Sequence, residues 1–237
     1  MNTIKDLFYK PNKKLISRKY DHYLEIYEVF LSKFQNTKPD ILEIGINQGG
    51  SLELWNDYFC GNCNIYGVDY KKESCRDIPK KLNAKNIHIE LGDQSDRNFW
   101  RNYLKDKPLF DIVIEDGGHR MEQQIVTFEE VFCNVKPGGF YICEDLHTNY
   151  WPKFGGGYKH GDTFIEYSKN FIDAIHANRI TDERSKPLQQ PHNIEDLKRL
   201  GGMIKSIHYY ESALVLEKAH KDYNISEICS NQPPTKL

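Results

Sequence analysis

The chain has 237 residues, of which 39% are hydrophobic and 28% charged, which excludes a disordered or fibrous protein. Its 32 Lys and Arg residues nearly balance 34 Asp and Glu residues, and this argues against a nucleic acid as the main partner. No apolar run reaches the roughly 18–20 residues of a membrane-spanning helix. The sequence begins without a secretory signal and its six cysteines are sparse, so we expect a cytoplasmic protein with reduced thiols.

Apolar residues recur at helical spacing within residues 17–35, and Pro39 follows shortly after this run. The spacing predicts a helix ahead of the first strand-like segment. We therefore expect a helical N-terminal extension over residues 1–36, a main domain over residues 37–220 and a C-terminal tail over residues 221–237.

Between residues 40 and 145 the hydrophobic pattern alternates between short strand-like runs and helical ones. Strands are predicted at 40–45, 64–69, 87–91, 109–114 and 140–143, and helices at 52–59, 73–83, 96–104 and 121–135. Such alternation predicts a parallel sheet covered by helices on both faces. Two further runs, 203–210 and 213–217, are separated by two residues, which predicts an antiparallel hairpin. The expected fold class is α/β, a Rossmann-like, doubly wound sheet of seven mostly parallel strands with a C-terminal antiparallel hairpin.

Acidic residues and glycines follow the first three predicted strands, at the edge where α/β sheets bind ligands. Gly45 and Gly49 let a ligand approach the backbone closely, but their spacing is not the G-x-G-x-x-G of a pyrophosphate site. Glu43, just before this turn, suits a cationic ligand such as an ammonium or a sulfonium. Asp69 is placed to accept hydrogen bonds from two ribose hydroxyls, and Asp93 to meet an adenine edge.

Two acidic pairs, Glu115-Asp116 and Glu144-Asp145, follow the next two predicted strands. Carboxylates gathered in one crevice repel each other unless a cation lies among them. All-oxygen ligands suit Mg²⁺, Mn²⁺ or Ca²⁺ better than zinc, so the pattern favours a divalent metal site. The alternative is that two of the acids only cap the following helices. Histidine titrates near neutral pH, so His119, two glycines beyond Asp116, suits a proton acceptor.

With these residues, the chain resembles the class I S-adenosylmethionine-dependent methyltransferases over about residues 38–218. The resemblance implies that S-adenosylmethionine binds along the first strand ends. We assign to its pocket Glu43, Gly45, Asn47, Ser51, Asp69, Asp93 and Glu115. A Rossmann enzyme of the NAD-binding type is the competing interpretation, which the missing G-x-G-x-x-G motif and the terminal hairpin disfavour.

Residues 115–119 (EDGGH) and 144–157 (EDLHTNYWPKFGGG) narrow the resemblance. Both segments are similar to those of the metal-dependent sugar O-methyltransferases, which include enzymes that methylate macrolide deoxysugars. The resemblance implies that His119 is the general base and that the metal chelates two neighbouring sugar hydroxyls. The implied ligands of Mg²⁺ (or Mn²⁺) are Asp116, Glu144 and Asp145.

We therefore expect a methyltransferase that acts on a sugar hydroxyl in bacterial natural-product, nucleotide-sugar or surface-polysaccharide biosynthesis. The sequence leaves open whether the acceptor sugar is free, nucleotide-linked or polymer-bound. A catechol-like or other small diol is the alternative acceptor, and a non-catalytic relative of the fold is the alternative to an enzyme. Aromatic residues and glycines within residues 150–158 suggest a lid over the sugar. Whether the helix at 17–35 packs on the sheet or joins two copies into a homo-oligomer also stays open.

Overall fold

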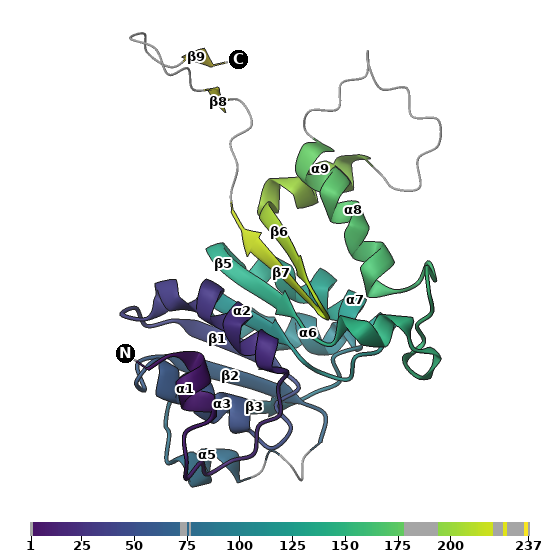
Figure 1. Cartoon of the computed structure of the whole chain (residues 1–237). Helices are drawn as coiled ribbons and strands as arrows, with labels where there is room; N and C mark the ends of the chain where they lie inside the picture. The colour runs from purple at the N-terminus through teal and green to yellow at the C-terminus, as the bar shows by residue number, and fades with distance from the viewer. Residues whose placement is uncertain are drawn as a thin grey trace.

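A sheet of seven strands forms the centre of the structure, a computed structural model that describes residues 2–71, 75, 77–177, 194–219, 225–226 and 235–236 (Figure 1). Across the sheet the strands follow the order β3-β2-β1-β4-β5-β7-β6. Their bounds are β1 Asp40–Ile44, β2 Asn64–Asp69, β3 Ile87–Leu91, β4 Phe110–Glu115, β5 Val135–Cys143, β6 Ile204–Tyr210 and β7 Ala213–Lys218. The predicted α/β class and Rossmann-like sheet are confirmed.

Strand β1 is the point at which the chain changes direction across the sheet. It pairs in parallel with β2 on one side and with β4 on the other. Strand β7 pairs antiparallel with both β5 and β6, which confirms the predicted C-terminal hairpin. In open α/β sheets, ligands bind outside the carboxyl ends of the strands at such a switch point. A site is therefore expected beyond the ends of β1 and β4.

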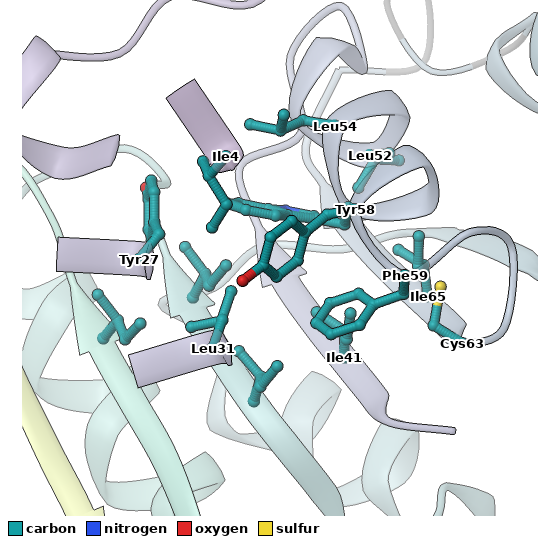
Figure 2. Close-up of a cluster of buried hydrophobic side chains, with 14 of the residues drawn as sticks. Ile4, Tyr27, Leu31, Ile41, Leu52, Leu54, Tyr58, Phe59, Cys63 and Ile65 are labelled. Atoms are coloured by element: carbon teal, nitrogen blue, oxygen red, sulfur yellow. The ribbon is translucent and has the colours of Figure 1, made fainter. Parts of the chain in front are cut away.

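Strand side chains alternate between two hydrophobic clusters, one on each face of the sheet. Along β4, Ile112 and Ile114 belong to the first cluster and Val113 to the second, because successive side chains of a strand point to opposite faces. Figure 2 shows part of the first cluster, where Ile41 and Ile65 of the sheet lie among helix side chains. Burial on both faces explains why these strands are apolar along most of their length.

Helices cover both faces. The first cluster includes side chains from α1 (Ile4–Phe8), α2 (Asp21–Leu31), α3 (Gly50–Tyr58) and α5 (Ile78–Leu82). The second includes side chains from α6 (Arg97–Tyr103), α7 (Met121–Val131) and α8 (Phe164–His176), with partly buried residues of α9 (Ile194–Met203) packed against it. Figure 1 shows α2 across the sheet from α6 and α7. Short 3₁₀ helices add to these elements: η1 Ser32–Phe34, η2 Leu104–Asp106, η3 Phe132–Asn134, η4 Leu146–Tyr150 and η5 Pro152–Phe154.

The N-terminal segment shares its core with the sheet. Tyr27 of α2 meets Trp55 of α3 edge to face, with ring centroids 4.9 Å apart. Ile4, Tyr27 and Leu31 all lie in the first cluster (Figure 2). Side chains from both sides of the predicted boundary at residue 37 therefore belong to one core. The sequence pattern does not predict α1, and α2 begins at Asp21, four residues later than expected.

The predicted tail 221–237 lies largely outside the described residues, and the polar stretch 181–193 lies outside them entirely. In the tail the structure describes β8 (Ile225–Ser226) and β9 (Thr235–Lys236), which pair antiparallel with each other. Among the helices of the described ranges, none is long and apolar enough to cross a bilayer.

Candidate active site

The carboxyl ends of β1, β4 and β5 bring together residues that are distant in the sequence. Asp116 directly follows β4, and its amide donates to the carbonyl of Ile44 at 2.9 Å. Glu144 directly follows β5, and its amide donates to the carbonyl of Glu115, also at 2.9 Å. The hydrogen bonds of the sheet thus continue through both acids, and this fixes them beside each other at the switch point.

Gly45 lets the end of β1 approach the end of β4. Its φ is +86°, in the left-handed region, and a Cβ at this position would lie 1.9 Å from the carbonyl oxygen of Asp116 and 2.5 Å from Gly117 Cα. Glycine has no Cβ, so it allows both the left-handed backbone and the close approach of the two strand ends. The close approach is between two stretches of backbone, and it sets the position of Asp116.

A cavity of about 510 Å³, here called the strand-end cavity, opens beside this junction. Four residues assigned to the cofactor pocket from the sequence line it: Gly45, Asn47, Asp69 and Asp93. The Asp69 carboxylate accepts hydrogen bonds from the amides of Asn47 and Lys71, each at 2.8 Å, and so links the ends of β1 and β2. The volume lies within the range of small-molecule sites in proteins.

Glu43, Ser51 and Glu115, also assigned to the cofactor pocket, do not line this cavity. Glu43 is fully buried, because the alternation along β1 turns it toward α3, where its Oε2 accepts a hydrogen bond from Trp55 Nε1 at 3.0 Å. Ser51 is buried in the first turn of α3. Glu115 is fully buried and accepts a hydrogen bond from Gln94 Nε2 at 2.7 Å. These side chains lie behind the wall of the cavity.

Burial changes the chemistry of Glu43. It raises the pKa of this carboxyl to about 7, and the nearby Lys19 ammonium opposes the effect without cancelling it. Glu43 Oε1 has no hydrogen-bond partner among the described residues. A carboxyl group that titrates near neutral pH therefore lies directly beneath the site.

A smaller cavity of about 280 Å³, here called the acidic cleft, is lined by the three acids predicted to bind a metal and by four residues of the N-terminal segment: Asp116, Glu144, Asp145, Arg18, Lys19, Tyr20 and Tyr23. Arg18 and Asp116 line both this cleft and the strand-end cavity. A ligand in one cavity is therefore adjacent to a ligand in the other.

The Lys19 ammonium lies between two of the acids. Its Nζ is 2.6 Å from Asp116 Oδ2 and 2.8 Å from Glu144 Oε2, and its side chain is 3% exposed. Burial acts to lower the pKa of Lys19, but Asp116 and Glu144 outweigh burial and hold this pKa well above its ordinary value. Burial raises the pKa of Glu144, and the Lys19 charge opposes that rise. Tyr27 donates a further hydrogen bond to Glu144 Oε1.

Asp145, the third predicted ligand, faces His119. Its Oδ2 lies 3.4 Å from His119 Nε2, and Asp116 Oδ1 lies 3.8 Å from the same nitrogen. These three residues can each place a ligand atom within 4.8 Å of the others, so the group fits a metal ion. His119 Nδ1 is buried without a hydrogen-bond partner among the described residues. Glu144 is not part of this group, and both of its carboxylate oxygens accept hydrogen bonds from Lys19.

Three of the assigned residues hold a left-handed backbone although they are not glycine. The φ angles are 42° at Asn47, 56° at His119 and 56° at Asp145. Such conformations cost about 1–3 kcal/mol each and persist where the surroundings enforce them, which is common at functional sites. At Asp145 the constraint is visible, because the Tyr23 phenol donates to its Oδ1 at 3.0 Å.

A third cavity of about 800 Å³, here called the aromatic pocket, adjoins the acidic cleft at Tyr20. Its rings come from stretches far apart in the chain: Tyr20, His22, His147, Tyr150, Trp151, Tyr209 and Tyr210. Tyr150 and Trp151 are 49% and 48% exposed. Exposed aromatic rings gathered in one hollow are typical of a surface that binds a partner or a ligand.

The segment predicted as a lid lies between His119 and the aromatic pocket. The Phe154 ring centroid is 6.4 Å from that of His119, and Trp151 packs against His147 at 4.6 Å. Asn149 anchors the segment, since its side-chain amide donates to Gln124 Oε1 of α7 at 2.9 Å. The loop is therefore held at its base and exposes its aromatic residues at its rim.

The sequence pattern does not predict the N-terminal residues of the site. Lys19 lies 97 residues from Asp116 and 125 residues from Glu144 along the chain, so no local pattern links them. Tyr23 and Tyr27 appear in the sequence only as apolar positions of a helix. The one available signal is that a buried tyrosine hydroxyl needs a hydrogen-bond partner.

No protein-family model matches the chain. It is 29% identical over 204 residues to the 8-demethyl-8-alpha-L-rhamnosyl tetracenomycin-C 2'-O-methyltransferase of Streptomyces olivaceus. This match covers 83% of this chain and 50% of that protein. It is also 32% identical over 206 residues to the mycinamicin VI 2''-O-methyltransferase of Micromonospora griseorubida, and this match covers 83% of this chain and 48% of that protein. The chain thus spans about half the length of the curated relatives it matches.

Among solved structures, the chain is similar to the MycE methyltransferase from the mycinamycin biosynthetic pathway, which was solved in complex with Mg and SAH. The TM-score is 0.75 at 28% identity, over 94% of this chain and 55% of MycE. The sequence comparison and the fold comparison thus point to the same group of relatives. The chain is a distant relative of the macrolide and deoxysugar O-methyltransferases, within the S-adenosylmethionine-dependent methyltransferases.

Proposed function

We propose that this chain is a divalent-metal-dependent O-methyltransferase that transfers a methyl group from S-adenosylmethionine to a sugar hydroxyl. The observation that carries the proposal is the junction of the strand-end cavity and the acidic cleft, which share Arg18 and Asp116. A methyl donor in the first and an acceptor hydroxyl in the second meet beside His119. The Streptomyces olivaceus relative is named for a rhamnosyl acceptor, which supports the choice of a sugar.

The lining of the strand-end cavity suits S-adenosylmethionine group by group. The Asp69 carboxylate, at the end of β2, is an acceptor for ribose hydroxyls, and Asp93 lies where an adenine edge is expected. The Arg18 guanidinium offers a cation to the carboxylate of the methionine part. The sulfonium then lies toward Asp116, between the two cavities.

The acidic cleft holds the divalent ion in this proposal, with Asp116 and Asp145 as ligands and Glu144 as the third predicted one. A bound ion would supply positive charge that lowers the pKa of the acceptor hydroxyl and makes its oxygen a better nucleophile. His119 Nε2, which faces both aspartates, accepts the hydroxyl proton. The two carboxylates stabilise the imidazolium that results.

The transfer is an in-line displacement. The acceptor oxygen forms a bond to the methyl carbon while the carbon–sulfur bond breaks, and the electron pair of the broken bond stays on sulfur. The sulfonium becomes a neutral thioether, and the hydroxyl proton ends on His119. Alignment of the two substrates is the main contribution of the chain, and alignment accounts for about 7–11 kcal/mol of a barrier in favourable cases.

The aromatic pocket supports an acceptor in which the sugar carries a larger group. The acidic cleft has a volume of about 280 Å³, whereas the adjoining aromatic pocket has about 800 Å³. Tyr20, Tyr150 and Trp151 offer flat faces for an attached ring. We place the acceptor sugar on a glycosylated bacterial natural product. Nucleotide-linked sugars and sugars of a surface polysaccharide are the further acceptors in this proposal.

The test is methyl transfer from labelled S-adenosylmethionine to rhamnosyl glycosides, nucleotide-linked deoxysugars and catechols, with EDTA or Mg²⁺ added. We expect a labelled sugar ether, loss of transfer in EDTA and recovery with excess Mg²⁺. Transfer that continues in EDTA contradicts the metal role, and transfer to catechols alone contradicts the sugar. Calorimetry that detects no S-adenosylhomocysteine binding would indicate a non-catalytic relative.

A further inference from the structure

Lys19 reaches the acidic cleft from a segment outside the sheet. Its ammonium contacts Asp116 Oδ2 at 2.6 Å and the two oxygens of Glu144 at 3.0 and 2.8 Å. These oxygens belong to two of the three acids predicted to bind the metal. A protein cation thus contacts carboxylate oxygens that the sequence predicts as metal ligands.

The backbone that carries Lys19 is held in place on α3. The amides of Lys14 and Leu15 donate to the two carboxylate oxygens of Glu53 at 3.1 and 2.9 Å. A Cβ on Gly50 would lie 2.3 Å from the carbonyl carbon of Ile16, so the segment rests directly on the helix. The side chain of Lys19 is therefore delivered to the cleft by a packed segment.

Charge explains why a cation is needed there. Asp116 and Glu144 lie close together, and carboxylates that share a desolvated site repel each other unless a cation lies between them. One ammonium satisfies this requirement, and one divalent ion would satisfy it as well. A divalent ion bound by Asp116 Oδ2 and the Glu144 oxygens would use the atoms that now hold the ammonium, so the two cations would exclude each other there.

We propose that Lys19 is a resident counter-ion that competes with the divalent metal for Asp116 and Glu144, and that a metal bound by these two acids displaces the Lys19 ammonium. The proposal rests on the metal requirement of the proposed function. It makes Lys19 a positioning residue that sets how tightly the metal binds. Lys19 does not occupy Asp116 Oδ1 or the Asp145 carboxylate, so these oxygens are the first contacts for an arriving ion.

The direct test measures Mn²⁺ binding to the full chain by electron paramagnetic resonance of the free ion, without S-adenosylmethionine or acceptor. We expect Lys19→Met to bind Mn²⁺ at least about tenfold more tightly than the wild type, since no buried ion pair has to be broken. Lys13→Met is the matched control, because Lys13 belongs to the same segment and pairs with Asp57 at 3.3 Å, outside the cleft. Equal or weaker Mn²⁺ binding by folded Lys19→Met would overturn the proposal.

A second measurement uses the wild type, since Lys19→Met leaves buried carboxylates uncompensated and is expected to be less stable without metal. An amine-acetylating reagent followed by mass spectrometry reports the accessibility of each lysine. We expect Lys19, 3% exposed, to react slowly in metal-free protein and at least about tenfold faster with saturating Mn²⁺, while Lys13 reacts equally in both. A Lys19 that stays protected with Mn²⁺ bound would refute displacement.

The two proposals fail separately. Mn²⁺ that exposes Lys19 in a chain without methyl transfer supports the competition and contradicts the proposed function. Metal-dependent methyl transfer with a Lys19 that stays protected supports the function and contradicts the competition. Absence of Mn²⁺ binding to both proteins contradicts the competition and the metal requirement together, while S-adenosylhomocysteine calorimetry still reports on the cofactor site.

Discussion

At the scale of single residues, His119 has the most constrained position in the site. Its backbone is left-handed, its Nε2 faces two aspartates, and its Nδ1 is buried without a partner in the described ranges. The same Nε2 is placed either to take a proton or to bind a metal. A nitrogen that coordinates a cation has no lone pair left for a proton, so the two roles exclude each other.

Substitution of His119 separates these roles. We expect His119→Ala to lower kcat by about 10²–10⁴, the usual contribution of a general base, with Mn²⁺ and S-adenosylhomocysteine affinities unchanged. Steady-state kinetics and calorimetry make the measurement, with His88→Ala of β3 as the control. If Mn²⁺ affinity falls together with kcat, His119 is a ligand and the assignment as base is wrong.

Glu43 links stability to pH. Burial raises its pKa from 4.5 to about 7 in the folded chain, so folding takes up a proton between these values. The contribution of this group to stability is full below about pH 4.5 and is lost as the pH rises through about 7, a change of about 2–4 kcal/mol. Between pH 5 and pH 8, Glu43→Gln should therefore lose less of its free energy of unfolding than the wild type does. Urea unfolding of both proteins at the two pH values measures this difference. Equal losses in the two proteins would contradict the raised pKa.

At the scale of elements, the junction of β1 with β4 is the most sensitive to a small change. Gly45 and Gly138 both have a left-handed φ, of +86° and +79°. A Cβ added at Gly45 would clash with the backbone of Asp116 and Gly117, whereas a Cβ added at Gly138 would have no atom within 4 Å. We expect Gly138→Ala to cost about 1–2 kcal/mol from the backbone alone. Gly45→Ala should cost more and should also weaken S-adenosylhomocysteine binding, because the clash moves Asp116. Unfolding and calorimetry compare the two variants, and equal costs would show that the close approach has no energetic weight.

At the scale of the whole molecule, the strand-end cavity joins the ends of several strands, so a ligand there should stabilise the complete fold. At a hundred times its dissociation constant, S-adenosylhomocysteine should add about 2.7 kcal/mol, seen as a rise in Tm that depends on concentration. Asp69→Ala should lose most of this rise, and Asp173→Ala, on the exposed face of α8, should keep it. An undiminished rise in Asp69→Ala would remove Asp69 from the cofactor site.

The fold could be predicted from the sequence because its strands are buried on both faces. Runs such as residues 109–114 are apolar almost throughout, and each ends at an acid or a glycine that marks the sheet edge. Asp116 and Asp145 could be placed at the site for the same reason. The contacts of Lys19 could not, because they depend on how a segment outside the sheet folds back over it. Glu43 and Glu115 look like cavity residues in the sequence, but the alternation of side chains along β1 and β4 buries them.

The position of Arg18 and Lys19 has a practical consequence for shortened versions of this chain. A version that starts with the first strand, near residue 37, retains every β-strand of the sheet yet lacks the guanidinium beside one cavity and the ammonium inside the other. It also leaves Tyr58 and Trp55 of α3 without the α2 side chains that pack on them. Truncation for crystallisation or assay should therefore leave α1 and the segment that follows it in place, and inactivity of a shorter form would say little about the longer chain.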